Sequence, residues 1–331
     1  GYQALDAFTT GYENVAVGTG AGGALTTGYT STFVGHGAGA SATTAGNNNY
    51  FGYAAGLGTT GGGNVGIGNH VMKNGSGDAA DNTAVGGSSL YAITTGDKNT
   101  TLGQSTGEAL TTTSNTVLIG YQAGYAINST DANGTVAIGY QAGHDITSGK
   151  YNTAIGYLAL DAEDDGDGNT AVGYQALTTQ TGTSGIVGNT AVGYNAGQSI
   201  TTAVQNVALG YAALSGTTTG GANIGIGYEA GKNNQTGTAN VFIGDQAGRG
   251  VFENSPGGNV GVGYRALMGI TNGSGNVVLG QYAADSLTSA QNNIIIGPAA
   301  GATMTTTSYT VLIGDNAGND INSVDASGTI A

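Results

Sequence analysis

Residues 169–177 read Asn-Thr-Ala-Val-Gly-Tyr-Gln-Ala-Leu, and variants of this stretch recur from one end of the 331-residue chain to the other. The glycine at its centre, Gly173, has counterparts at nearly regular intervals, most of them 17 residues long. We number each repeat from this glycine, so that Asn169 is at position −4 and Ala176 at position +3. The repeat glycines are residues 1, 18, 35, 52, 68, 86, 103, 120, 139, 156, 173, 193, 210, 227, 244, 263, 280, 297 and 314. Such a period is typical of a solenoid.

The three residues before each repeat glycine predict a short strand. Position −1 is apolar throughout, position −3 is mostly Val, Ile or Thr, and position −2 is most often Ala or Gly. Side chains at −3 and −1 point to one face of a strand and the side chain at −2 to the other. Because both faces are apolar, we expect both to be buried, so an Asp at Ile155 should be severely destabilising.

The sequence therefore predicts an all-β protein, a parallel β-solenoid of about 18 coils with a 17-residue repeat, each coil holding two short strands and two turns. At ~4.8 Å per coil the rod should be about 85 to 90 Å long. We expect one continuous array over residues 1–331. We also expect it to be cut at both ends, because residues 1–5 lack the strand before their glycine and the last repeat breaks off before its own.

Position −4 predicts a polar ladder. It is Asn in 14 of the 18 repeats in which it can be read, and the four exceptions are Ser31, Thr116, Thr135 and Thr310. In a stack of identical turns, each side-chain amide lies over the next at the strand spacing and can donate to one neighbour and accept from the other. We interpret the column as turn-stabilising rather than as a ligand site.

Composition excludes several classes of function. Six Lys and Arg stand against 20 Asp and Glu, for a net charge of −14, so nucleic acid and anionic membrane surfaces are poor partners. No apolar run approaches the ~18 to 20 residues that span a bilayer. The chain has no Cys, which excludes disulfides and thiolate metal sites and is compatible with an extracellular location.

The order Asn or Ser at −4, Val or Thr at −3, Ala at −2, Ile or Val at −1 and then Gly, with Ala three residues later, resembles the head repeat of YadA-like trimeric autotransporter adhesins. Residues 152–157 (Asn-Thr-Ala-Ile-Gly-Tyr) and 139–143 (Gly-Tyr-Gln-Ala-Gly) also look like repeats of phage tail-fibre-like proteins. The resemblance covers the whole chain, although the coils here are longer. It implies a homotrimer of left-handed parallel β-rolls. It also implies a rigid shaft or adhesin of an extracellular, cell-surface or virion appendage that binds a glycan or protein receptor.

Position −2 gives a separate reason to expect a trimer. A thin solenoid with an apolar −2 face would leave a long exposed stripe of Ala and Gly, with occasional Phe or Leu. Small side chains there would let three rolls approach closely around an axis.

The most charged segment, residues 161–168, predicts a calcium site. Asp161, Glu163, Asp165 and Asp167 supply oxygen ligands at alternate positions before a Gly turn, and Asp145 of the neighbouring coil could add another. The twelfth position is Val172, where an EF-hand would supply a bidentate Glu. The alternative interpretation is a solvated acidic corner.

No enzyme is predicted. The histidines, His36, His70 and His144, fall at different repeat positions and form no column or facing pair. Outside residues 161–168 the carboxylates are scattered singly, which disfavours a polysaccharide-degrading tailspike.

Two other columns leave alternatives open. Thr pairs at +8 and +9, such as Thr9-Thr10 and Thr94-Thr95, suggest either loop residues or an ice-binding array. The Tyr column at +1 suggests either stacking between coils or platforms for sugars. Residues 124–134, 177–188 and 248–258 lie in the repeats that exceed 17 residues, so we expect these loops to project and to contact partners.

Overall fold

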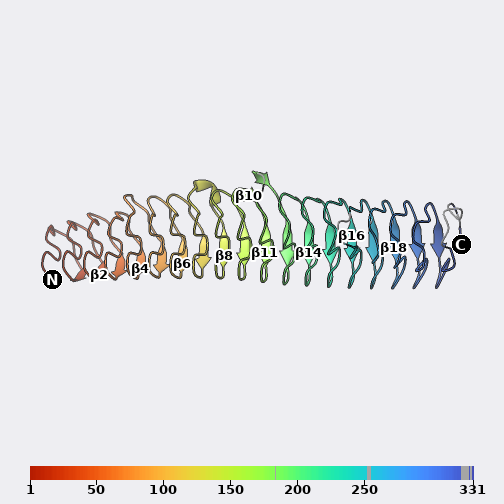
Figure 1. Ribbon diagram of the computed structural model, residues 1–331. Coiled ribbons are helices and arrows are strands. Elements are labelled where there is room, and N and C mark those ends of the chain that lie inside the picture. The colour runs from red at the N-terminus through yellow and green to blue at the C-terminus, as the bar shows by residue number, and fades with distance from the viewer. Residues whose placement is uncertain (183, 252–254, 322–327, 329) are drawn as a thin grey trace. The chain divides into compact units, whose positions relative to one another are not determined.

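The computed structural model describes residues 1–182, 184–251, 255–321, 328 and 330–331. The chain divides into two compact units, Gly1–Gly168 and Asn169–Ala331, and each is a stack of coils (Figure 1). In both units one three-residue strand per coil pairs in parallel with the strand of the next coil. The protein is thus an all-β parallel β-solenoid, which confirms the fold class predicted from the repeat.

The first unit contains strands β1 (Val15–Val17), β2 (Thr32–Val34), β3 (Asn49–Phe51), β4 (Val65–Ile67), β5 (Thr83–Val85), β6 (Thr100–Leu102), β7 (Val117–Ile119), β8 (Val136–Ile138), β9 (Thr153–Ile155) and β10 (Gly166–Asp167), and the 3₁₀ turn η1 (Thr130–Ala132). The second contains β11 (Thr170–Val172), β12 (Gly185–Ile186), β13 (Thr190–Val192), β14 (Val207–Leu209), β15 (Ile224–Ile226), β16 (Val241–Ile243), β17 (Val260–Val262), β18 (Val277–Leu279), β19 (Ile294–Ile296) and β20 (Val311–Ile313).

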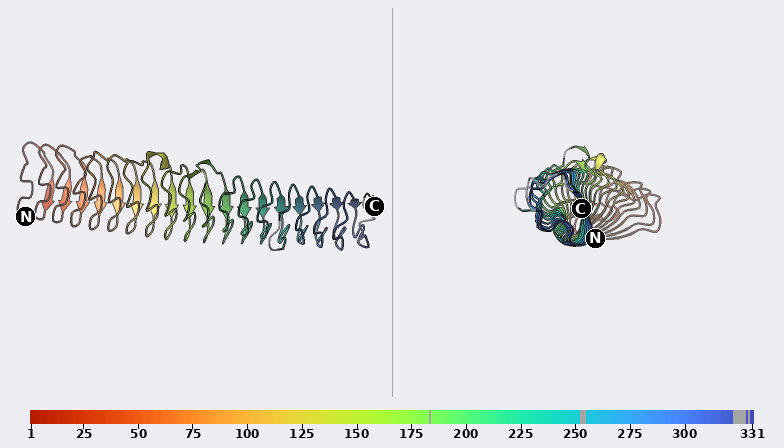
Figure 2. Two further views of the ribbon diagram at one scale, coloured as in Figure 1. Left: turned by 45° about the horizontal axis from the view of Figure 1, so that its top comes forward. Right: turned by 90° about the vertical axis from the view of Figure 1, so that its right-hand side faces the viewer.

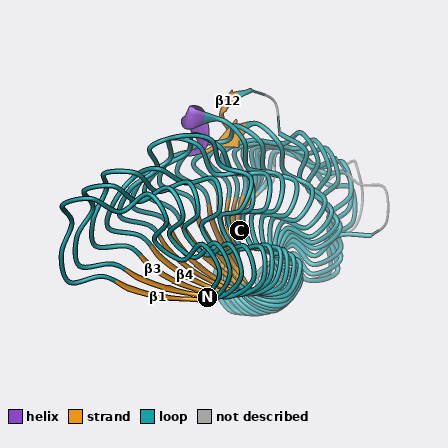
Figure 3. Ribbon diagram, turned by 90° about the vertical axis from the view of Figure 1, so that its left-hand side faces the viewer, coloured by secondary structure: helices purple, strands orange, loops and turns teal. Residues whose placement is uncertain are grey.

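The register of the sheet follows the repeat. Position −2 of one coil pairs with position −2 of the next, as Ala137 does with Ala154 in the first unit and Ala191 with Ala208 in the second. Successive strands are therefore aligned on one side of the coils of each unit, and turns make up the remainder (Figures 2 and 3).

The prediction of two strands per coil is wrong, because the chain after the repeat glycine is not extended. Positions +2 and +4 have positive φ, as at Gln141 (50°) and Leu160 (52°), and an extended strand cannot form through such residues. The amide of Gln141 donates to the Tyr121 carbonyl in the preceding coil (2.9 Å), whereas the amide of Gly143 donates to the Ala159 carbonyl in the following one (2.9 Å). Because the peptide groups point alternately to the preceding and the following coil, the backbone donors and acceptors are hydrogen-bonded between coils without a second strand.

The prediction that both strand faces are buried is also wrong. Position −2 is buried in nearly every paired strand, while −3 and −1 are half-buried or exposed, as in β6, where Thr101 is buried and Thr100 and Leu102 are exposed. The buried side chains at −2 face those at +3, +4 and +7 inside the coil, for example Ala137, Ala142 and Ile146. The −2 column is therefore core, and it cannot form a surface between copies.

The asparagine ladder is confirmed. Asn99 is buried, its side-chain amide donates to Asn82 Oδ1 (3.0 Å) and to the Thr113 carbonyl (2.9 Å), and its own Oδ1 accepts from the next coil. Thr116, one of the exceptions, still donates to that Oδ1 through both its amide (3.0 Å) and its hydroxyl (2.8 Å). Positions −4 and −2 share the inward face, which explains why −3 and −1 face outward.

Candidate functional site

The outward side chains at −3 and −1 form a continuous apolar surface on each unit, which we call the strand face. It comprises positions −3 and −1 of β1 to β9 in the first unit, and of β11 and β13 to β20 in the second. Several of its large apolar side chains are well exposed, including Leu102 (49%) and Ile313 (62%). Val, Ile, Thr, Leu and single Asn and Phe residues make up the whole face, and it contains no charged residue. Sequence reasoning missed this surface because it predicted that both faces of the strand are buried.

The tyrosines at position +1 form regular stacks beside the strands. Tyr121, Tyr140 and Tyr157 stack in the first unit with ring centroids 5.5 and 5.1 Å apart. Tyr174, Tyr194, Tyr211 and Tyr228 stack in the second at 4.9 to 5.2 Å. All seven are 41 to 47% exposed. Because each inner ring is covered on its faces by its neighbours, it offers edges and hydroxyls rather than the open face on which a sugar would stack. The geometry favours stacking between coils.

A second polar column occupies position −6, and sequence reasoning did not detect it. The amide of Ala80 donates to Asp97 Oδ1 (2.7 Å), that of Asp97 to Ser114 Oγ (2.9 Å) and that of Ser114 to Asn133 Oδ1 (2.6 Å). Position −6 holds Asp, Ser, Thr, Asn, Gln, Lys, Tyr, Gly and apolar residues in different repeats, so no single residue type marked it. The residues at −6 that accept these hydrogen bonds share a short side chain with an oxygen acceptor.

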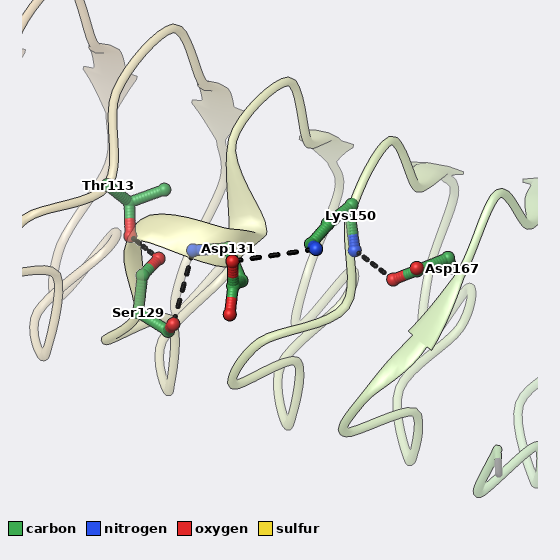
Figure 4. Close-up of polar contacts among 5 residues, drawn as sticks. All are labelled: Thr113, Ser129, Asp131, Lys150 and Asp167. Carbon is green, nitrogen blue, oxygen red and sulfur yellow. Dashed lines mark hydrogen bonds and ion pairs between the residues drawn. The ribbon is translucent and has the colours of Figure 1, made fainter. Parts of the chain in front are cut away.

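Of residues 124–134, the part around η1 projects at a coil corner (Figures 3 and 4), whereas Gly124 and Ile127 are buried in the coil. Thr130 and Asp131 are exposed, and the Asp131 carboxylate lies 3.5 Å from Lys150 Nζ. The Lys150 amide donates to Asp167 Oδ1 (2.8 Å), which continues the column at −6. In the loop at 177–188, Ile186 is exposed, whereas residue 183 lies outside the described residues, as do 252–254 of the third loop.

The acidic segment brings together only part of the predicted calcium set. One carboxylate oxygen from each of Glu163, Asp164 and Asp165 lies within 4.8 Å of the other two. Glu163 is buried, and its Oε1 accepts the amides of Asp164 (3.1 Å) and Gly166 (2.8 Å), so it caps the turn. Burial and the neighbouring Asp164 raise the pKa of the Asp165 carboxyl. Calcium binding here stays a prediction.

The other two predicted ligands lie outside this group. Asp167 belongs to the column at −6, where its Oδ1 accepts the Lys150 amide. Asp161 lies near His144 and Asp145 of the preceding coil. Burial raises its pKa, His144 lowers it and Asp145 raises it further. Asp145 in turn is 2.6 Å from His144 Nδ1. The two ends of the acidic segment therefore contact the preceding coil, and neither belongs to the group of Glu163, Asp164 and Asp165.

The histidines take part in ring stacking. His36 and His70 both contact Tyr53, at centroid distances of 5.4 and 5.2 Å, and His144 stacks on Tyr125 at 5.1 Å. The group of possible metal ligands found among the described residues contains no histidine.

The threonines at +8 form a further ladder. The Thr9 hydroxyl donates to the Thr26 carbonyl (3.0 Å), and the Thr94 hydroxyl to the Thr111 carbonyl (3.0 Å). These hydroxyls stabilise the stack from coil to coil, so their geometry favours the loop interpretation over a free array for ice.

Most of the few cations are also used within the units. Glu229 is largely buried between Lys232 Nζ (2.6 Å) and Arg249 Nε (2.9 Å), and Arg265 pairs with Asp285 (3.1 Å). These pairs leave little free positive charge for an anionic partner.

Neither protein-family models nor curated protein sequences match the chain. The resemblance to adhesin and tail-fibre repeats therefore remains a hypothesis that rests on the motif. Among the described residues, no helix combines the length and apolar character needed to cross a bilayer.

Proposed function

We propose that this chain is a structural segment of an extracellular or virion appendage, a rigid shaft or adhesin that holds a binding surface away from its base. The observation that carries the proposal is the hydrogen bonding between coils. Besides the backbone, side chains at −6, −4 and +8 link coils at recurring positions, as Asp97, Asn99 and Thr94 do. Such parallel ladders resist bending and stretching together, which suits a mechanical element.

The proposal includes assembly as a homotrimer, which the motif resemblance implies. Its original physical support, small −2 side chains at the surface, is lost because these side chains are core. The exposed strand face supplies a different reason for assembly, since large apolar surfaces on a soluble chain mark interaction sites.

The proposed function does not involve catalysis. Glu163, the buried member of the acidic group, is engaged by backbone donors and is not presented to a substrate. The projecting corner around Asp131 and the loop around Ile186 are the proposed contact points for a cell-surface glycan or protein receptor.

Antibodies against the chain would test the proposal on the intact source particle. We expect gold label along filaments that extend from a cell or virion surface. Label confined to the cell interior would contradict the proposal. A thermal-hysteresis measurement on the purified chain tests ice binding, the alternative function, and we expect no hysteresis.

A further inference from the structure

We infer that copies of this chain meet through the strand face, parallel and in register, each coil lying against the corresponding coil of its neighbour. The inference rests on the proposed fibre function and deepens it by naming the surface and the partner.

The strand face of one unit is large enough for a small interface. Nine strands at ~4.8 Å, each about 10 Å long, give about 430 Å² per unit. Two such faces together bury about 860 Å², which is above the ~800 Å² that most crystal-packing contacts do not reach and in the range of small, transient interfaces. Because Val, Ile, Leu and Thr dominate the face, most of this area is apolar.

The charge distribution points to a second copy as the partner. Two chains of net charge −14 repel each other wherever their carboxylates meet. The strand face has no charged residue, and the carboxylates nearest to it along the chain, Glu13 and Asp81 at −5 and Asp245 and Asp315 at +1, lie beyond its edges. It is therefore a surface on which two acidic chains can approach without opposing like charges.

The spacing of the strands also favours a second copy of this chain, aligned in register, as the partner. A partner with a different spacing would lose its match with the strands after a few coils, whereas another copy keeps it throughout a unit. Individual irregularities, such as Asn49 and Phe51 in β3, also coincide only when the copies are in register.

Single cysteines test the register directly, because the chain has no cysteine of its own. We expect Leu102→Cys and Leu209→Cys to form disulfide-linked dimers of identical positions under mild oxidation. The control, Thr95→Cys, is exposed at a turn and should remain unlinked. A mixture of Leu102→Cys and Ile67→Cys, two coils apart, should yield only homodimers. Linkage between unlike positions would overturn the parallel register.

Charge substitutions test the surface itself. In analytical ultracentrifugation, the double variant Leu102→Lys and Leu209→Lys should weaken association of the 331-residue chain at least about tenfold. The control with Thr27→Lys and Thr95→Lys places the same charges at exposed turns and should associate like the unmodified chain. If the lysine variant does not fold, as judged by circular dichroism, the cysteine experiment alone decides.

The outcomes separate the two proposals. Oligomers that survive the strand-face lysines and form no Leu102 or Leu209 cross-links would overturn this interface and leave the fibre function standing. A chain that stays monomeric at tens of micromolar would overturn the interface and the homotrimer together. Filament labelling that fails while strand-face cross-linking succeeds would overturn the appendage and leave the interface.

Discussion

At the scale of single residues, the repeat position requires glycine because the backbone of the next coil lies against it. Gly139 has φ +142°, and a Cβ there would lie 2.3 Å from the Gly156 carbonyl oxygen. No side-chain movement relieves a contact with backbone, so Gly139→Ala should lower the free energy of unfolding by about 3 kcal/mol or more. Urea denaturation measures this. Gly20→Ala is the control, because its Cβ meets nothing within 4 Å and only its φ of +68° costs about 1 kcal/mol.

The core at position +4 is matched to position −2. Repeats with a large −2 residue have Gly at +4, as Phe242 and Gly248 do, whereas Leu at +4 accompanies Ala or Gly at −2. A Cβ at Gly248 would lie 2.1 Å from Phe242 Cδ1, so we expect Gly248→Leu to cost several kcal/mol through overpacking. Gly143→Leu should cost much less, because Ala137 stands at −2 and its nearest contact is the movable end of Ile146. Thermal unfolding of both variants decides; equal losses would contradict the matching.

The pKa of Asp161 makes stability depend on pH. Burial raises this pKa above its ordinary value of 3.8, with His144 lowering and Asp145 raising it less. The folded protein therefore favours the protonated carboxyl, and its contribution to stability is present below pH 3.8 and lost as the pH rises through the raised pKa. We expect Asp161→Asn to match the unmodified chain at the acid end and to be more stable at pH 7. Denaturant titration across this range tests the prediction, and a difference independent of pH would contradict it.

The sequence was enough to predict the asparagine ladder, because its period and the chemistry of an amide define both partners of each hydrogen bond. It did not predict the matching of Gly248 with Phe242, since these residues meet only once the coil path is known. The calcium set was predicted from spacing along an assumed loop. The local turn instead gathers Glu163, Asp164 and Asp165, while Asp161 and Asp167 contact the preceding coil.

At the scale of the element, the orientation of the strand was the decisive missing fact. Alternation shows which residues share a face but not which face is inside. The Asn at −4 indicates the orientation, because an amide ladder shielded from water requires position −4 to point inward. Position −2 lies on the same face and must point inward too. Small residues at −2 concealed this, because Ala and Gly fit a core as well as a surface.

Two substitutions in β9 test this orientation. Ala154 is buried at −2, and Ala154→Asp should prevent folding or cost several kcal/mol, because its carboxylate would be unpaired in the core. Ile155 is half-buried at −1, so Ile155→Asp should cost far less than the severe loss that burial of both faces implied. Circular dichroism and denaturation of the two variants compare them. A greater loss at Ile155 would show that the assigned orientation is wrong.

At the scale of the whole molecule, each unit is a chain of nearest-neighbour contacts. A paired strand contacts the strands of the preceding and following coils, and most side-chain hydrogen bonds span about one repeat, as between Asn82 and Asn99. Stability in such an array is close to a sum of coil terms and interface terms. The low content of large apolar residues is consistent with this description, because each coil buries only a few side chains but packs against two neighbouring coils.

The consequence is that damage should remain local. Asn99→Ala removes the acceptor of the Thr116 amide and hydroxyl and the side-chain donor to the Thr113 carbonyl, leaving buried polar groups without partners. In native-state hydrogen exchange we expect protection to fall at β5, β6 and β7 while β2 and β9 keep theirs, because they share no contact with the altered coil. Thr95→Ala, at an exposed turn, serves as the control and should leave all five strands protected. Uniform loss of protection across the first unit would mean that it opens as one cooperative body and would refute the nearest-neighbour description.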